Sequence, residues 1–521
     1  MNRYLLFITR RERIDTPLWI LSIFSSLLFF TVLYPTLIPT AEEALALART
    51  MQNPAMVAMM GPIYGIDAIS QAIVMSQETL LWYLIAIALM NIFLITRHTR
   101  TDEELGRVEL LLAKPIASKT PAIAPIIFAL IVNIIIAFFS ACGLLIVNLE
   151  GTTLCGALAF GAAMGVVGFF FAALTLLLAQ LFATTTGVVT AGLSFLGGSY
   201  ILRAFGDLQE SSLSLYSPFG LALKVQAFYT NDLWPIGIIL LPAVALIGLA
   251  LLFNHVRDHG GGIIPQRAGR FHAPKSLLSP LGFAWRLSRG VMIAWGSALF
   301  ILGLSYGSVI GELDTFVQSN ELMKAIILQG GPNTLEDGYV ALIFAIMAMV
   351  AGIPVMLSAL RIRGEELQGR SELIFAQPTN RIGVYLPFLL IAFIESILMT
   401  VLLALGLVLG SKSTLALGEM ICYGFAYLPA IWFIGGIATF LVGALPSLTS
   451  LIWLLFASSF IITYVKQITQ VPSWLSALNP FELVPRVPIE PFTAKPLIVL
   501  TIITALLVGG GLYRFERRDL D

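Results

Sequence analysis

Long apolar runs alternate with short polar stretches along almost the whole chain. Many of these runs approach the roughly 20 apolar residues that an α-helix needs to cross a bilayer. We expect twelve membrane-spanning helices, at residues 18–38, 79–96, 122–148, 154–182, 186–204, 234–254, 289–310, 338–360, 384–409, 418–443, 447–465 and 496–513. The pattern therefore predicts an all-α polytopic membrane protein with 12 transmembrane helices.

The polar stretches differ in charge on the two sides of the predicted membrane. With the N-terminus inside, the inner stretches contain 22 of the 30 Lys and Arg residues, whereas acids such as Glu42, Asp207 and Glu312 collect in the outer ones. Basic loops stay on the cytoplasmic side of a membrane, so both chain ends are predicted to be cytoplasmic. The first apolar run exceeds the roughly 7–15 residues of a signal-peptide core, which favours an uncleaved first helix.

One polar stretch occurs twice. Residues 97–119 lie between the second and third predicted helices, and residues 361–381 hold the same place in the second half of the chain. Aligned without a gap at a separation of 369 − 106 = 263 positions, the stretches match at Gly106 and Gly369, Arg107 and Arg370, Glu109 and Glu372, Ala113 and Ala376, and Pro115 and Pro378. A match at so many corresponding positions indicates an internal duplication.

The duplication extends beyond the polar stretch. Ser217-Pro218-Phe219 before the sixth predicted helix corresponds to Asn479-Pro480-Phe481 before the twelfth. The sequence thus predicts two parallel six-helix repeats, residues 1–254 and 286–521, joined by a Gly- and Pro-rich cytoplasmic linker at 255–285. Repeats of this kind normally enclose a transport path at their interface.

The composition supports a membrane protein and excludes other classes. With 58% hydrophobic and only 12% charged residues, the chain is far too apolar for a soluble globular protein. A formal net charge of zero gives no basic surface for nucleic acid. The chain contains no Gly-x-x-x-x-Gly-Lys-Ser/Thr phosphate loop, and no inner loop is long enough for a nucleotide-binding domain. We therefore expect neither an ATPase site nor a cofactor in the chain itself.

The repeated stretch has the pattern of a short helix. Glu103 and Arg107 stand at i and i+4, as do Glu366 and Arg370, and this orientation stabilises a helix. The predicted apolar stripe of the first copy consists of Leu105, Val108, Leu111 and Leu112. The two prolines Pro115 and Pro378 are expected to end the helices. A solvated loop helix would show the same features once, but its recurrence favours a functional element.

The stretch from Glu104 to Pro115 resembles the coupling-helix segment of type-2 ATP-binding-cassette permeases. The fused twelve-helix layout resembles the polyketide-antibiotic exporter permeases of that class. The resemblance implies a permease subunit that exports a hydrophobic or amphipathic compound, such as an antibiotic or drug, from a bacterium across its plasma membrane. It also implies two copies of a separate ATP-binding subunit as partners, which bind the ATP and Mg, beside the lipid bilayer and a small hydrophobic substrate.

In such permeases the segment between the second and third helices of each half receives the ATPase. The resemblance thus implies a docking role for six charged residues: Glu103, Arg107, Glu109, Glu366, Arg370 and Glu372. It also implies that the segments around Arg10–Arg13 and Arg286–Arg289 are connecting helices along the inner surface. The second copy has Leu367 where the first has Glu104, a departure that makes equal docking of the two copies doubtful.

A few polar residues fall within the predicted membrane helices. Glu395 is an acid placed deep in the ninth helix, where a charge costs about 2.5–3.5 kcal/mol on insertion scales. It is either a neutral group bonded to a neighbouring helix or part of a substrate or proton path. Asn91 and Asn133 could line the same path or hydrogen-bond between helices. The motif Gly161-x-x-x-Gly165 predicts that two helices pack closely. We expect no metal site.

Two other functions have to be weighed. A secondary transporter of the major facilitator type, driven by a proton gradient, would also have six plus six helices and a polar element between its second and third helices. Few buried acids and the absence of that family's Asp-Arg-x-Gly-Arg run argue against it. A membrane-embedded enzyme would need convergent polar groups, and the sequence shows no His, Ser or Asp partner for Glu395 at its depth.

Overall fold

The computed structural model is helical throughout the part of the chain that it describes. It describes residues 2–52, 54–113, 117, 119–257, 260–264, 269, 271–310, 335–376, 380–411, 415–468, 476 and 479–519. Within these ranges, 11 helical segments are long and apolar enough to cross a membrane. The prediction of an all-α polytopic membrane protein is therefore confirmed.

The spans of the first half are α2 (Asp15–Leu37), α5 (Gln71–Thr96), α8 (Thr120–Val147), α9 (Leu154–Leu181), α10 (Thr185–Leu208) and α12 (Trp234–Val256). Those of the second half are α13 (Pro280–Ile310), α16 (Leu335–Leu367), α18 (Arg381–Gly410), α19 with α20 (Leu417–Ala426 and Leu428–Ala444) and α23 (Ala494–Arg517). The expected span at 447–465 falls on α21 (Leu451–Ile468), whose described apolar stretch is shorter than the others. The count of twelve therefore stays a prediction.

The chain divides into two compact units, Met1–Gly269 (unit 1) and Arg270–Asp521 (unit 2). The division falls within the stretch 255–285 that the sequence marks as a linker. The first part of this stretch belongs to unit 1, because the N–H of Ile264 donates to the carbonyl of Leu181 at the end of α9, at 2.9 Å. Residues 263 and 264 of this stretch therefore contact the end of α9.

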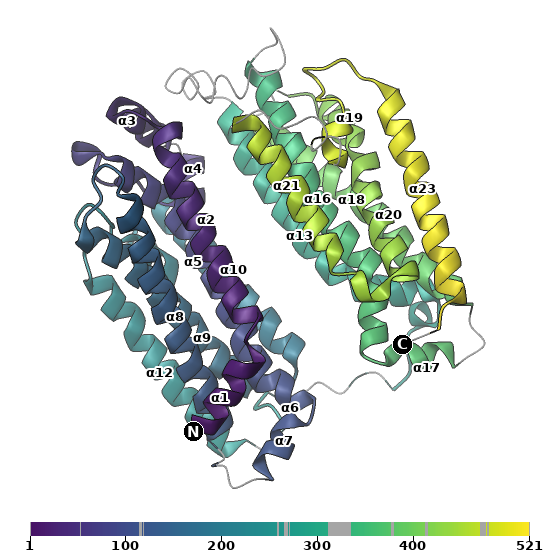
Figure 1. Cartoon of the computed structure of the whole chain (residues 1–521), viewed down its shortest axis with the longest axis horizontal. Helices are drawn as coiled ribbons and strands as arrows, with labels where there is room; N and C mark the ends of the chain where they lie inside the picture. Colours follow the sequence, from purple (N-terminus) through teal and green to yellow (C-terminus); the bar gives the residue numbers. More distant parts are fainter. Residues whose placement is uncertain are drawn as a thin grey trace. The chain divides into compact units, whose positions relative to one another are not determined.

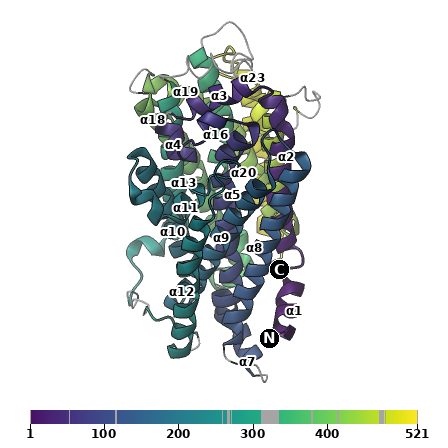
Figure 2. The ribbon, with the colours of Figure 1, turned by 90° about the vertical axis from the view of Figure 1, so that its left-hand side faces the viewer.

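Helix α9 is the core of unit 1, where it packs against α5, α8 and α12 (Figure 2). Glycines permit the close approach of α8. A Cβ added at Gly161 would lie 2.3 Å from the carbonyl oxygen of Ala137, and one at Gly165 would lie 3.2 Å from the Ala137 Cβ. The predicted close packing at Gly161 and Gly165 is therefore confirmed.

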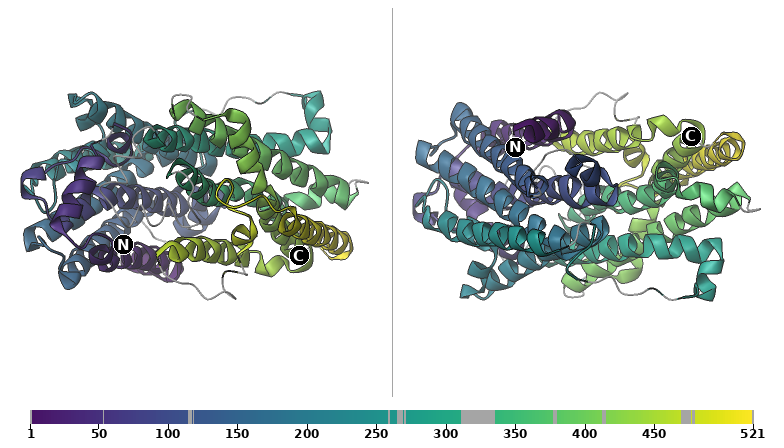
Figure 3. Two further views of the ribbon diagram at one scale, coloured as in Figure 1. Left: turned by 90° about the horizontal axis from the view of Figure 1, so that it is seen from above. Right: turned by 90° about the horizontal axis from the view of Figure 1, so that it is seen from below.

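In unit 2 the most extensive helix packing joins α13 and α18. A Cβ added at Gly307 would lie 2.3 Å from the carbonyl oxygen of Leu407, and one added at Gly410 would lie 2.3 Å from that of Leu304. Small residues on both helices thus bring the two backbones together. The helices of each unit run side by side, and many are seen nearly end-on in Figure 3.

One end of unit 1 carries α1 (Asn2–Arg11), α6 (Asp102–Glu104) and α7 (Arg107–Leu112), and the opposite end carries α3 (Ala41–Thr50) and α4 (Pro54–Met60) (Figure 1). Helix α1 is separate from α2, as expected for a connecting helix. In unit 2 the segment around Arg286–Arg289, for which a connecting helix was also expected, is instead part of the same helix as the membrane span, α13.

At one end of unit 2, α17 (Arg370–Phe375) lies near the end of α23, and α19 lies at the opposite end (Figure 1). The repeated Pro-Phe motif has the same local geometry in both units. Ser217 and Asn479 each accept the N–H of the following phenylalanine, Phe219 at 3.2 Å and Phe481 at 3.1 Å. Each side chain thus caps a short helical turn that is buried in its unit.

Candidate functional site: two charged elbows

Each unit contains a sharp turn at the end of a long helix, at the position of the repeated polar stretch. We call residues 97–113 elbow 1 and residues 360–376 elbow 2. The turns are made by Gly106, with φ +66°, and Gly369, with φ +68°. These values favour glycine, and nothing lies within 4 Å of a Cβ added at either position. Backbone conformation, not crowding, therefore requires glycine here.

Elbow 1 begins with an ion pair that the sequence did not predict. The pairing expected between Glu103 and Arg107 is wrong, because the glycine turn ends the helix between them. Arg107 instead places Nη1 3.1 Å from Asp102 Oδ1. Both oxygens of Asp102 also accept from Arg11 of α1, at 2.7 and 2.6 Å. Asp102 is buried, whereas Arg107 is 49% exposed and keeps a free face.

Elbow 2 repeats this pairing with one difference. The pair expected between Glu366 and Arg370 is also wrong, for the same reason. Arg370 places Nε 2.8 Å from Glu365 Oε2, and its side chain is 53% exposed. The further partner of Glu365 is Arg361, at 3.6 Å, from the same helix. The buried acid of elbow 2 is thus held by neighbours in sequence.

A second acid in elbow 1 is held by two buried arginines. Glu103 accepts from Nη1 of Arg100 at 2.9 Å and from Nη1 of Arg257 at 2.9 Å. Arg100 is fully buried and donates further to the carbonyl of Ala179 in α9, at 2.7 Å. Arg257 is the residue that follows α12. Glu103 therefore faces the interior of unit 1.

The second acid of elbow 2 has the same kinds of partner. Glu366 accepts from Nη1 of Arg363 at 3.2 Å and from Nη2 of Arg518 at 2.5 and 2.6 Å. Arg518 is the residue that follows α23. Each unit thus joins this acid to an arginine three positions earlier and to the arginine that follows its last long helix.

The outward face of each elbow combines charge with an apolar side chain. Glu109 and Glu372 are exposed, and beside them Leu110 is 73% and Leu373 is 75% exposed. The two leucines were missed by the stripe pattern, although the 263-residue alignment pairs them. Sequence alignment could therefore have found this feature where helical periodicity did not.

The predicted apolar stripe of elbow 1 is divided. It comprised Leu105, Val108, Leu111 and Leu112. Val108 is buried and Leu111 is partly buried, but Leu105 is exposed because it lies in the glycine turn. The side chain of Leu112 and the two prolines predicted to end the helices lie outside the described residues.

Comparison with known proteins identifies the family. Residues 277–516 match the family described as "Multidrug efflux system permease Rv1217c, C-terminal domain". Over 520 residues the chain is 30% identical to the multidrug efflux system permease protein Rv1217c of Mycobacterium tuberculosis (strain ATCC 25618 / H37Rv), covering 98% of this chain and 93% of that protein. The chain belongs to this family of ABC-type exporter permeases. The major facilitator alternative is therefore set aside, and this permease is a multi-pass transport subunit.

Two of the polar residues predicted for the transport path are fully engaged within the permease. Asn91 of α5 donates to Asn133 of α8 at 3.0 Å, and Asn133 donates back at 2.8 Å. Each also donates to a carbonyl one turn earlier in its own helix. Both are buried, and the pair joins two helices beneath Gly168 of α9. This geometry is interhelical hydrogen bonding.

Glu395 has a different environment in the permease. It is fully buried on α18. Within the described chain neither carboxyl oxygen accepts a well-formed hydrogen bond, although Ser358 of α16 faces it. A carboxyl group buried at membrane depth with such sparse partners is costly to the fold. Among the three residues predicted for a substrate or proton path, Glu395 is thus the one whose side chain can still accept hydrogen bonds.

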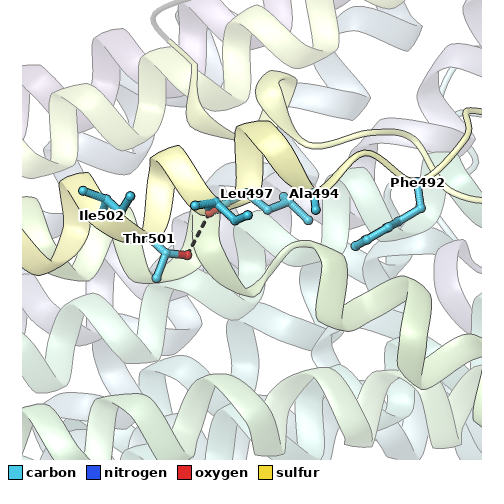
Figure 4. A pocket seen from close by; sticks show the side chains of 6 residues that line it. Phe492, Ala494, Leu497, Thr501 and Ile502 are labelled. Atoms are coloured by element: carbon cyan, nitrogen blue, oxygen red, sulfur yellow. Dashed lines mark hydrogen bonds between the residues drawn. The ribbon is translucent and has the colours of Figure 1, made fainter.

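A groove of about 350 Å³ follows the start of α23. It is lined by Phe492, Ala494, Leu497, Ile498, Thr501 and Ile502 (Figure 4). The Thr501 hydroxyl donates to the Leu497 carbonyl of its own helix at 2.8 Å, which leaves an almost wholly apolar surface. No residue predicted for the site lies in this groove.

Proposed function

We propose that this permease is the membrane subunit of an ATP-driven exporter, and that its two elbows bind a separate ATP-binding subunit, one copy at each. The observation that carries the proposal is the two-sided construction of each elbow. The inner acids are fixed by buried arginines, while the arginine, glutamate and leucine on the outer side stay exposed. A short helix held rigidly from behind presents a stable surface to a partner.

The chemistry of this face fits a protein partner. An exposed leucine beside charges of both signs provides an apolar anchor with a polar rim, the usual composition of protein interfaces. The same residue types recur at the same positions in both elbows, which supports two copies of one partner. In this proposal the elbows and both chain ends are cytoplasmic, and the protein lies in the plasma membrane of a bacterium.

The substrate class and the energy source also belong to the proposal. The relative is named a multidrug efflux permease, which supports export of a small hydrophobic or amphipathic drug-like compound. ATP and Mg would be bound by the partner, and this chain would contribute no ATPase site. Nucleic acid has no part in this function.

Co-purification with the ATP-binding subunit tests the docking. Arg107→Ala with Arg370→Ala, and separately Leu110→Ala with Leu373→Ala, should each weaken association by about tenfold or more, since exposed anchors of an interface are each worth about 1–2 kcal/mol. Leu278→Ala is the matched control, because Leu278 is 76% exposed and lies outside both elbows. Unchanged association and ATP turnover in both elbow variants would overturn the docking assignment.

We further propose that Glu395 is a polar group of the substrate or proton path. Its unpaired carboxyl oxygens support this role, whereas the mutual hydrogen bonds of Asn91 and Asn133 do not. Glu395→Gln keeps the shape and removes the titrating proton. It should change the pH dependence of transport in vesicles, and an identical pH profile would leave Glu395 with a packing role alone.

A further inference from the structure

We propose that Arg257 and Arg518 are positioning residues that clamp each elbow to the last long helix of its own unit. Through these clamps, a displacement of an elbow would be passed to α12 in unit 1 and to α23 in unit 2. The inference rests on the proposed function, in which the elbows receive the ATPase, and it concerns where the movement goes next.

In unit 1 the clamp joins three parts of the fold. Arg257 places Nη1 2.9 Å from Glu103 Oε2, and Nη2 also bonds Glu103 Oε1. Nε donates to the side chain of Gln180 in α9 at 2.6 Å, and Nη1 donates to the carbonyl of Gly261 at 2.9 Å. The side chain is only 3% exposed. All three nitrogens of this guanidinium therefore donate hydrogen bonds within unit 1.

In unit 2 the clamp is simpler. Arg518 Nη2 binds both oxygens of Glu366, at 2.5 and 2.6 Å. The guanidinium also lies 5.1 Å from the ring centre of Phe515 in α23. The backbone carbonyl of Arg518 accepts from Nη1 of Arg381, at the start of α18, at 2.5 Å. The end of α23 is thus fixed both to elbow 2 and to the start of α18, the helix that follows elbow 2 in the chain.

The backbone at both clamps is the same. Arg257 ends α12 with φ −83° and ψ 149°, and Arg518 ends α23 with φ −77° and ψ 151°. Each helix stops in an extended residue whose side chain reaches the elbow. An aspartate follows each arginine in the sequence. The two helix ends, at corresponding places of the duplicated halves, thus share one geometry, which supports a common role.

The clamp arginines differ from the other partners of the same acids. Arg100 and Arg363 lie only three positions before their acids, so these two ion pairs are local, although Arg100 also links elbow 1 to α9 through the carbonyl of Ala179. Arg257 and Arg518 lie 154 and 152 positions from theirs, so they join separate elements. Removing a clamp leaves each acid with its local arginine, and the fold can survive the loss of the link.

The last helices are well placed to spread a movement. Helix α12 packs against α9, the core of unit 1, and α23 packs against α20. A shift of α12 or α23 therefore acts on the most buried helices of its unit. Bonds between buried charges suit this task, because their directional geometry resists sliding better than apolar contacts do.

The test uses the assembled transporter in vesicles and measures substrate transported per ATP hydrolysed. Arg257→Ala with Arg518→Ala should retain ATPase binding but lower this ratio about tenfold, within the usual range for the coupling of two sites. Arg514→Ala is the matched control, because Arg514 is an exposed arginine in the last turn of α23. Arg257→Lys with Arg518→Lys keeps both positive charges beside the acids and should retain part of the ratio.

Hydrogen–deuterium exchange of the permease alone provides a second readout. Arg257→Ala should speed exchange in residues 97–113 about tenfold, and the Arg514→Ala control should not. A ratio and an exchange rate equal to those of the unaltered protein would overturn the clamp. If the elbow variants fail to weaken ATPase binding while Arg257→Ala still speeds exchange, then the proposed docking fails and the clamp stands.

Discussion

The two elbows share a plan but differ in how widely they are fastened. Elbow 1 is bound by Arg11 of α1 through Asp102, and by Arg257 after α12 through Glu103. In the described part of elbow 2, Arg518 after α23 supplies the distant attachment, and the other arginines come from the elbow or its own helix. Among the described residues, the acids of elbow 1 thus form ion pairs with two arginines outside the elbow, and those of elbow 2 with one.

A further attachment of elbow 1 explains a sequence difference between the two elbows. Glu104 accepts from the backbone N–H of Thr185 at 2.8 Å and so fastens the elbow to the start of α10. A carboxylate at a helix N-terminus also interacts favourably with the helix dipole. The aligned residue in elbow 2, Leu367, is 71% exposed and forms no such bond. The sequence difference thus removes an attachment and adds exposed apolar surface, so the outer faces of the two elbows are not equivalent.

The largest expected effect comes from the second acid of each elbow. Glu103→Ala leaves Arg100 and Arg257 buried without their anion, and breaking a buried pair in this way costs about 3–5 kcal/mol of unfolding free energy. Glu366→Ala should cost less, because Arg363 and Arg518 are each 12% exposed and can reach water. Denaturant unfolding in detergent measures both variants, and equal losses would contradict the asymmetry.

A smaller loss is expected when the connection to α1 is removed. Arg11→Ala deletes two charged hydrogen bonds to Asp102 while Arg107 remains, so the loss should be about 1–3 kcal/mol. Arg361→Ala is the comparison in elbow 2, where a pair at 3.6 Å with a 39% exposed arginine should contribute less than about 1 kcal/mol. Thermal unfolding compares the two, and a larger effect of Arg361→Ala would reverse our ranking.

The sequence predicted the fold better than the contacts of the site. Apolar runs longer than a bilayer crossing are local signals, so the long helices could be placed from composition. The glycines at 106 and 369 aligned correctly, but the charges around them had helical spacing, which concealed the turn. Because Asp102 and Arg107 lie on either side of a left-handed residue, the actual partner is one position from the expected one.

The long-range ion pairs could not be read from the sequence at all. Arg11 and Asp102 lie 91 positions apart, and Arg257 and Glu103 lie 154 positions apart. Nothing local distinguishes these arginines from other basic residues of the inner loops, since their partners depend on how the helices pack. The Arg-Asp dipeptide after each last helix was a usable signal, because it recurs at corresponding places in the two halves.

Removing the contact between Glu104 and Thr185 should make the two elbows more alike. Glu104→Leu removes two hydrogen bonds from Thr185, one from its N–H and one from its hydroxyl, and should cost about 1–2 kcal/mol. Hydrogen exchange in residues 97–113 should then approach the rate in 360–376. Leu367→Ala is the control, because it shortens an exposed side chain without removing a bond. Unchanged exchange after Glu104→Leu would show that Glu104 does not hold elbow 1 in place.

The smallest expected difference between the two elbows is in their response to pH, and it comes from Glu12 in unit 1. Burial pushes the pKa of Glu12 upward, but the hydrogen bond and charge of His98, with the charge of Arg97, outweigh it and bring the pKa down to about 2. Alignment of Arg10 with Arg286 and of Arg13 with Arg289, at a separation of 276 positions, places Ser288 opposite Glu12, and a serine hydroxyl does not titrate in this pH range. The Glu12 carboxylate therefore fastens the junction of α1 and α2 to the end of α5 in unit 1 only.

A carboxyl group whose pKa is lower in the folded than in the unfolded protein stabilises the fold above its unfolded value and loses this contribution as the pH falls. For Glu12 the loss should extend from about pH 4.5, its ordinary pKa, down to about pH 2. Elbow 1 should loosen before elbow 2 over this window, as measured by exchange rates corrected for pH. Glu12→Gln should flatten the difference, since its amide cannot titrate. Equal acid loosening of both elbows in the unaltered protein would mean that Glu12 does not hold this corner.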